Sequence, residues 1–309
     1  MGKIDNTMSE LKFRTEMDFV YAMPREVAPG VVRVVANNPS VFTFKGTNTY
    51  IVGGGDDLCL IDPGPEDQAH YDALMRVIGE RKVSHILITH THRDHIDGLA
   101  PVAAATGAAI CGYGRQPHAA DAVINSPSGA EFFDDTFTPD QVLRDGDTIA
   151  GSDWSIEAVF TPGHAPDHLS FALADRGILF SGDHVMGWNT SVVAPPEGNM
   201  ADYLASLERL TSRSDTVYLP GHGGQIAEPQ RFAKAYLLHR RVREQAILKA
   251  IQSGDDTITK VVATVYKGLD ERLVRAACLS VQAHVEHLAE RHMVSIPRPL
   301  AFDAPITAA

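Results

Sequence analysis

The chain has few cysteines and no long apolar run. Its three cysteines, Cys59, Cys111 and Cys278, are far apart among 309 residues. This odd, scattered set argues against a disulfide framework and fits a reducing compartment. No stretch approaches the roughly 18 consecutive apolar residues of a membrane span, and the polar N-terminal sequence MGKIDNTMSELKFRTEMDF lacks the apolar core of a secretory signal. These absences predict a cytoplasmic protein that has no membrane partner.

Positive charge is also scarce in most of the chain. Lys and Arg number 27 against 39 Asp and Glu, which gives a net charge of −12. From residue 229 onward there are 12 basic and 8 acidic residues, a balance of +4, so residues 1–228 carry −16. An acidic body disfavours nonspecific nucleic-acid binding, which depends on Lys and Arg, although it does not exclude a local basic groove. The change in charge predicts a domain boundary near residue 229.

Short strand-like runs alternate with helical ones up to residue 228. The runs are rich in β-branched and aromatic residues and usually end in Gly, Pro or Asp, as strands do; they cover 31–36, 48–52, 58–62, 85–90, 108–113, 154–160, 168–174, 177–183 and 216–222. Helices are expected near 67–79, 97–106 and 200–213. This order predicts two sheets with helices outside them. The polar segment 114–148 is expected to be a long surface excursion.

The sequence after residue 229 is helical in character. Helices are expected over 230–252, 258–266 and 271–290, and apolar residues recur at helical spacing in the last of these. The run MVSIPRPLAF near the end could supply a pair of strands. Three helices and two strands predict a small winged-helix-like appendage, and it could also form a homodimer by burying an apolar face.

The stretch THTHRDHIDG at 89–98 predicts half of a metal site. His90 and His92 lie two apart on an extended strand end, face the same side and can bind one ion together. Asp94 and His95, on the turn that follows, can reach a second ion. Three later strand ends pair a glycine turn with a His or Asp: TPGHAPDH with His164, SGDH with Asp183 and PGHG with His222. Only the ordered set carries the prediction of a two-metal site, because each fragment alone is common.

With GTNTYIVG (46–53) and IDPG (61–64), these motifs resemble the metallo-β-lactamase superfamily over nearly the whole chain. The pattern is most similar to the β-lactamase-like protein 2 group of that superfamily. The resemblance implies an α/β fold, an αββα sandwich, with a small C-terminal helical, winged-helix-like domain. We therefore expect a polar N-terminal extension over 1–18, a catalytic domain over 19–228 and the winged-helix-like domain over 229–309.

The resemblance also implies how the ligands divide between two ions. One ion would be held by His90, His92 and His164, the other by Asp94, His95 and His222, and Asp183 would bridge both. Asp94 could in addition act in catalysis as a proton acceptor. Zinc is the metal expected with His and Asp ligands, although manganese or iron could occupy the same positions.

Residues around the ligands are predicted to support the site or contact the substrate. Asp62 is expected to orient a ligand imidazole, and His168 to support the site or lie near the substrate. Candidate substrate contacts are Asn189, Thr190, Arg240 and Arg243. For Arg240 and Arg243 the alternative is an ordinary solvated helix face.

Paired divalent ions lower the pKa of a bridging water, polarise a carbonyl or phosphoryl oxygen and stabilise an anionic transition state. The predicted function is a dinuclear zinc-dependent hydrolase that uses a metal-bridging hydroxide on a small ester, thioester or lactone. An endoribonuclease acting on single-stranded RNA is the main alternative, and a noncatalytic metal-binding interaction module is a third. Structural zinc sites are closed and rich in cysteine, which disfavours the third. Class B1 β-lactamases use a cysteine ligand and diiron branches carry a glutamate at the position of His92, so neither activity is expected.

Overall fold

The computed structural model describes residues 13–114 and 133–309. Within these residues seven strands form one sheet, in the order β1-β2-β3-β4-β5-β6-β7. They are β1 (Arg25–Ala28), β2 (Val31–Val35), β3 (Asn48–Val52), β4 (Asp57–Ile61), β5 (Lys82–Leu87), β6 (Ala109–Gly112) and β7 (Gln141–Val142). Six strands form a second sheet, in the order β13-β12-β11-β10-β9-β8. They are β8 (Thr148–Ala150), β9 (Ser155–Phe160), β10 (Leu169–Leu173), β11 (Ile178–Gly182), β12 (Val217–Pro220) and β13 (Ile226–Ala227).

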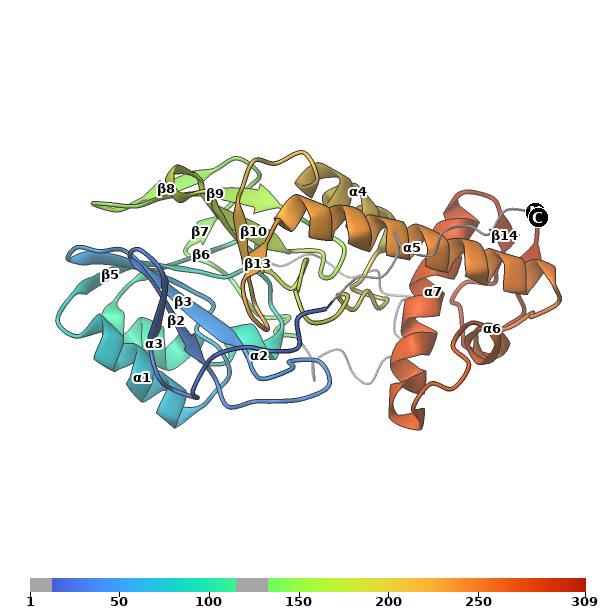
Figure 1. Ribbon diagram of the computed structural model, residues 1–309, viewed down its shortest axis with the longest axis horizontal. Coiled ribbons are helices and arrows are strands. Elements are labelled where there is room, and N and C mark those ends of the chain that lie inside the picture. Colours follow the sequence, from blue (N-terminus) through green and yellow to red (C-terminus); the bar gives the residue numbers. More distant parts are fainter. Residues whose placement is uncertain (1–12, 115–132) are drawn as a thin grey trace.

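Helices cover the outer face of each sheet: α1 and α3 lie below the first sheet in Figure 1, and α4 and the first half of α5 (Pro229–Gln252) pack on the second, whereas the rest of α5 extends to the right. The helices of the main body are α1 (Gln68–Ile78), α2 (Arg93–Ile96), α3 (Leu99–Thr106) and α4 (Met200–Leu210). Two of them begin with a side-chain cap: Asp67 accepts from the N–H of His70 at 2.8 Å, and Asn199 accepts from the N–H of Asp202 at 3.0 Å. Such caps satisfy N–H groups that have no partner within the helix.

Three apolar clusters hold these layers together. The inner faces of the sheets meet through Ile61, Leu87, Phe171 and Phe180, among others. Leu74 and its neighbours on α1 pack under the first sheet. Tyr203 and Leu207 of α4 and Tyr236 of α5 pack over the second sheet. The layers therefore follow the order helix, sheet, sheet, helix, and the predicted αββα sandwich is confirmed.

The C-terminal part is helical, as expected. It contains α5 (Pro229–Gln252), α6 (Ile258–Val265), α7 (Val274–Glu290), β14 (Val294–Ser295) and β15 (Thr307–Ala308), and the two short strands pair antiparallel. The second half of α5 packs with α6 and α7 in a separate apolar cluster around Ile247, Val261 and Val281. The long helix α5 therefore contributes to two cores, and the boundary predicted at residue 229 falls on its first residue.

One expectation about the fold is wrong in part. Residues 115–132 of the segment 114–148 lie outside the described residues, but the rest of it is more than a surface excursion. Phe137 and Leu143 are buried, and β7 extends the first sheet beside β6. The sequence pattern does not reveal these two buried positions. Polar residues separate Phe137 from Leu143, and β7 is only two residues long, which is too short to show an alternating pattern. Among the described residues, no helix is long and apolar enough to cross a membrane.

Candidate metal centre

The candidate site lies where strands of both sheets end. Strands β11 and β12 are parallel neighbours, so Asp183 and His222, which follow them, leave the second sheet side by side. Strands β4 and β5 are parallel in the first sheet, which places Asp62 beside Thr89 at the start of the histidine motif. Parallel pairing thus brings segments far apart in the sequence to one edge of the sandwich.

His90, His92 and His164 form the first ligand group. Nδ1 of His92 lies 2.9 Å from Nε2 of His90 and 3.0 Å from Nε2 of His164. The three nitrogen atoms therefore face one small volume, which matches the three imidazoles predicted to hold one ion.

The opposite nitrogen of each ring has its own partner. Nε2 of His92 lies 3.0 Å from Oε2 of Glu197, and Nδ1 of His164 lies 2.6 Å from the carbonyl oxygen of Val192. Nδ1 of His90 lies 2.9 Å from Oγ1 of Thr89, and that hydroxyl donates its hydrogen to Asp62 at 2.7 Å. Each ring must therefore donate outward, which leaves three lone pairs pointing inward. Three such lone pairs cannot hydrogen-bond to one another, and a cation is the partner that fits them.

The second group consists of Asp94, His95 and His222. Oδ2 of Asp94 lies 3.2 Å from Nε2 of His222 and 3.5 Å from Nε2 of His95. Here too the outer nitrogens donate outward, from His95 to Oδ2 of Asp62 at 2.8 Å and from His222 to the carbonyl oxygen of Gly46 at 3.2 Å. Nε2 of His95 is buried and has no hydrogen-bond partner among the described residues. A buried ring nitrogen without a partner, beside two carboxylates, fits a metal ligand.

Asp183 lies between the two groups. Its Oδ2 is 3.2 Å from Nε2 of His222 and 3.7 Å from Nε2 of His164, and its Oδ1 is 3.5 Å from Nε2 of His95. Glycine is required beside it, since a Cβ at Gly221 would approach Oδ1 of Asp183 to 2.5 Å. The structure thus brings all seven predicted ligands together, with Asp183 in the position expected of a bridging residue.

Burial and charge act differently on the histidines of the two groups. Burial lowers the pKa of His164 to about 4 and that of His90 well below its usual value, whereas Glu197 raises the pKa of His92 against the effect of burial. Burial also opposes the charged form of His222, but the carboxylates of Asp183 and Asp94 outweigh it and raise the pKa of His222 to about 9. The pKa of His95 is likewise raised by Asp94, Asp183 and Asp62 against the effect of burial. The second group therefore attracts positive charge, from protons or from a metal ion.

The two predicted supporting residues, Asp62 and His168, each contact a predicted ligand. Asp62 accepts from His95, and its backbone has a left-handed φ of 53°. Nε2 of His168 accepts from the backbone N–H of Asp183 at 3.1 Å, and its Nδ1 lies 2.9 Å from Oγ1 of Thr161. Both nitrogens of His168 are thus engaged, so it positions Asp183 and is not itself a ligand.

The predicted substrate contacts lie in two different places. Asn189 is exposed and Thr190 half-buried on the segment after β11, where the N–H of Thr190 donates to Oδ1 of Asn189 at 2.9 Å. Arg240 corrects the expectation of a surface or groove residue: it is only 4% exposed, donates to the carbonyl oxygen of Ser191 and lies over the ring of Tyr203. The reason is that its guanidinium satisfies a buried carbonyl group between α5 and the segment after β11.

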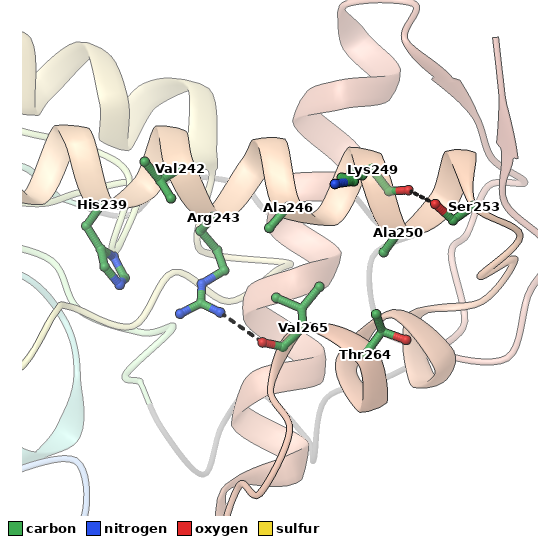
Figure 2. Close-up of a pocket in the computed structure, with 9 residues that line it drawn as sticks. All are labelled: His239, Val242, Arg243, Ala246, Lys249, Ala250, Ser253, Thr264 and Val265. Carbon is green, nitrogen blue, oxygen red and sulfur yellow. Dashed lines mark hydrogen bonds between the residues drawn. The ribbon is translucent and has the colours of Figure 1, made fainter. Parts of the chain in front are cut away.

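Arg243 lines a groove between α5 and α6 of about 480 Å³. Figure 2 shows its guanidinium directed toward the carbonyl oxygen of Val265, 3.5 Å away, with His239 and Lys249 along the same helix. Arg243 also stacks on Tyr266, with 4.2 Å from its Cζ to the ring centre. Arg240 and Arg243, both predicted to contact the substrate, therefore lie apart: Arg240 is buried inside the protein, and Arg243 lines this groove.

Sequence reasoning missed several groups that orient the ligands. Thr47 donates to Oδ2 of Asp94 at 3.1 Å, although its motif predicted only the start of a strand. Glu197, the partner of His92, lies in the loop sequence PPEG, which carries no recognisable motif. The carbonyl groups of Gly46 and Val192 have no side-chain signal at all, because any residue supplies a carbonyl oxygen.

A sandwich of this topology, with clustered His and Asp side chains at the strand ends, defines the class of metal-dependent hydrolases with the metallo-β-lactamase fold. The family model described as "Metallo-beta-lactamase superfamily" matches residues 42–222, and "Beta-lactamase associated winged helix domain" matches residues 257–295. The chain belongs to the metallo-β-lactamase superfamily and carries the associated winged-helix domain. Both were predicted from the sequence and are confirmed.

Similar proteins extend this result. "Beta-lactamase-like protein 2 homolog" of Drosophila melanogaster is 32% identical over 87% of this chain and 90% of its own length. "Atrochrysone carboxyl ACP thioesterase" of Cryptosporiopsis sp. is 31% identical over 78% of this chain and 73% of its own. A β-lactamase domain protein from Burkholderia ambifaria shares the fold, with a TM-score of 0.78 at 20% identity over 94% of this chain and 96% of its own. The protein is a metal-dependent hydrolase, which sets aside the noncatalytic alternative.

Proposed function

We propose that the protein is a dinuclear zinc-dependent hydrolase of a small ester, thioester or lactone, with thioesters favoured. The observation that carries the proposal is the set of inward-facing lone pairs of His90, His92 and His164 beside the orphaned Nε2 of His95. Asp183 lies within 3.7 Å of ligand atoms of both groups. A relative named as a thioesterase, 31% identical, supports the choice of thioesters.

When bound, two divalent ions lower the pKa of water, polarise a carbonyl oxygen and stabilise an anionic transition state. The first ion would be held by His90, His92 and His164, the second by Asp94, His95 and His222, with Asp183 shared. Zinc suits imidazole and carboxylate ligands, and manganese or iron would fit the same set. Zinc is the proposal because the ligands are mainly imidazoles.

Asp94 is the residue to which we assign proton transfer. Its side chain is 28% exposed, against 9% for Asp183, so it is the ligand carboxylate that solvent reaches more easily. Thr47 donates to its Oδ2 and fixes the carboxylate at the site. A carboxylate that binds an ion through one lone pair keeps others with which it can accept a proton from water.

A panel of substrates tests the proposal. The zinc-loaded protein is expected to hydrolyse thioesters faster than lactones or aryl esters, and His92→Ala should reduce the rate to background. Hydrolysis of none of the three classes by the zinc-loaded protein would refute the proposal. Equal rates for His92→Ala and the wild type would refute it as well, since the activity would then not arise at this site.

Cleavage of single-stranded RNA is the second candidate function. The groove between α5 and α6 supports it, because Arg243 and Lys249 line it together in the part of the chain, residues 229–309, that carries a net charge of +4 (Figure 2). Cleavage of a labelled RNA oligonucleotide that disappears with Asp183→Ala would favour this function. Binding without a steep salt dependence would count against it, since phosphate contacts release counterions.

Two further predictions are kept as proposals. A homodimer through the C-terminal domain would bury exposed apolar residues such as Leu273 and Val274 at the start of α7. Light scattering of the full chain is expected to give twice the monomer mass, and a monomer mass would contradict it. A cytoplasmic location is likewise proposed, and fractionation of cells tests it.

A further inference from the structure

The loop between β11 and α4, residues 183–199, supplies the outer partners of two first-group histidines. We call it the β11–α4 loop. Oε2 of Glu197 lies 3.0 Å from Nε2 of His92, and the carbonyl oxygen of Val192 lies 2.6 Å from Nδ1 of His164. The other oxygen of Glu197, Oε1, is buried and has no hydrogen-bond partner among the described residues. The contact with His92 is therefore the principal observed interaction of this carboxylate.

A carboxylate in this position does two things to His92. By accepting from Nε2–H it fixes the tautomer in which Nδ1 carries the lone pair, and it fixes the plane of the ring. Its negative charge also makes the imidazole more basic and a stronger donor to a cation. Glu197 thus has the position and chemistry of a residue that orients a metal ligand.

The helix α5 holds the β11–α4 loop in place. The hydroxyl of Tyr236 shares its single hydrogen between the carbonyl oxygens of Met186 and Asn189, and the guanidinium of Arg240 donates to the carbonyl oxygen of Ser191. Both side chains are buried, with Tyr236 fully enclosed and Arg240 only 4% exposed. The anchored carbonyl groups precede Val192 in the sequence, and that of Ser191 is its direct neighbour, so the loop is fixed close to the point where it meets His164.

The direct partners of the second group come from other parts of the chain. His95 donates to Asp62 after β4, and His222 donates to the carbonyl oxygen of Gly46 before β3. Asp94 accepts from Thr47, also before β3. These partners lie at the ends of strands of the first sheet. The β11–α4 loop, in contrast, follows a strand of the second sheet and contacts α5.

We propose that Glu197 is a positioning residue for His92, and that α5, through Tyr236 and Arg240, braces the loop that orients the first ligand group. Binding of the first ion then depends on the C-terminal helix more strongly than binding of the second, which shares only Asp183, at the start of the loop, with the first. The proposal rests on the proposed two-ion site and deepens it, because it gives α5 a role in metal binding.

Zinc titration of the metal-free full-length chain against a chelator tests the role of Glu197. In a His222→Ala background, which leaves the first group intact, Glu197→Ala should weaken zinc binding by about 10- to 100-fold. Glu197→Gln should stay within several-fold of its parent, because the amide oxygen accepts the same N–H. Unchanged binding in Glu197→Ala would overturn the proposal. So would an equal loss in Glu197→Gln, which would mean that Glu197 acts through its charge and not by positioning the ring.

The role of α5 is tested with Tyr236→Phe and Arg240→Met, which keep most of the packing. Each is expected to weaken the first zinc-binding step about tenfold and to change the second step less, since only Asp183 links the loop to the second ion. Arg241→Ala is the matched control on the same helix, since Arg241 only pairs with exposed Glu208. Tyr236→Phe keeps the test decisive if Arg240→Met does not fold. An equal change in both steps, or none in either folded variant, would contradict the proposal.

Turnover separates this proposal from the proposed function. In Glu197→Ala the turnover number should return to within several-fold of wild type once zinc exceeds the weakened dissociation constant. A turnover number that stays low at every zinc concentration would overturn the positioning role, because it would make Glu197 a catalytic residue. Absence of hydrolysis in the wild type would refute the proposed function, and the zinc-binding tests would still decide the role of Glu197.

Discussion

The two ligand groups are built from similar side chains but are supported by different parts of the protein. The first group has three imidazoles, two of which depend on the β11–α4 loop and so on α5. The second group combines a carboxylate with two imidazoles and depends on Asp62 and on residues 46–47 of the first sheet. Asp62 also reaches the first group, since it accepts from Thr89, which in turn accepts from His90.

This difference shows why the site lies between the two sheets. Neither sheet carries a complete set of ligands and supporting groups, so both ion sites are complete only when the sandwich is assembled. Binding of the first ion should respond mainly to changes in the β11–α4 loop and α5. Binding of the second ion should respond mainly to changes at the edge of the first sheet. Variants can therefore separate the two groups.

The largest effect is expected from the residue that both groups share. Asp183→Asn keeps the shape of the side chain but removes the charge between the ions, and it should lower kcat/KM for a thioester by about 1000-fold, or about 4 kcal/mol. Steady-state kinetics of the zinc-loaded variant measures this. A decrease of less than tenfold would show that Asp183 does not serve both ions.

Asp62→Asn should weaken the binding of both ions, by about 10- to 100-fold each. The amide has one acceptor oxygen in place of two, whereas Asp62 accepts from His95 and from both the N–H and the hydroxyl of Thr89. Zinc titration against a chelator resolves the two binding steps. If only one step changes, the link from Asp62 through Thr89 to His90 is wrong.

The pH dependence of zinc binding should differ between the groups. His222, with a pKa of about 9, carries a proton at neutral pH in the metal-free protein, and an ion must displace it. Affinity for the second ion should therefore rise at least about tenfold per unit between pH 7 and 9. In the first group burial lowers the pKa of His90 and His164, and only the pKa of His92 is raised, by Glu197 against the effect of burial, so the first step should change less. Equal slopes for both steps would contradict the assignment.

The smallest effect is expected from Thr47→Val, which keeps the shape of the side chain and removes one hydrogen bond to Asp94. It should weaken binding of the second ion by about tenfold, which is at the low end of the effects expected from a residue that orients a ligand. Binding of the first ion should be unchanged. The same titration measures it. A change in the first step instead would reverse the division of support between the groups.

Much of the site follows from the sequence because its ligands are side chains at fixed places. His90 and His92 face the same side since they are two apart on an extended segment, and Gly182 and Gly221 mark close approaches of the backbone. The fold follows for a similar reason, as alternating strands and helices leave few ways to cover two sheets.

The rest of the site depends on contacts that a sequence does not encode locally. Glu197 and His92 are 105 residues apart in the sequence, and only the assembled sheets bring them together. Arg240 has the sequence context of an exposed cluster, yet tertiary packing buries it against Ser191. Carbonyl partners such as those of Gly46 and Val192 have no residue-specific signature.

Anomalous diffraction from crystals of the zinc-loaded protein tests the central claim most directly. The account predicts two zinc peaks on either side of Asp183, one among His90, His92 and His164 and the other among Asp94, His95 and His222. A single peak, or peaks away from Asp183, would contradict a shared two-ion site.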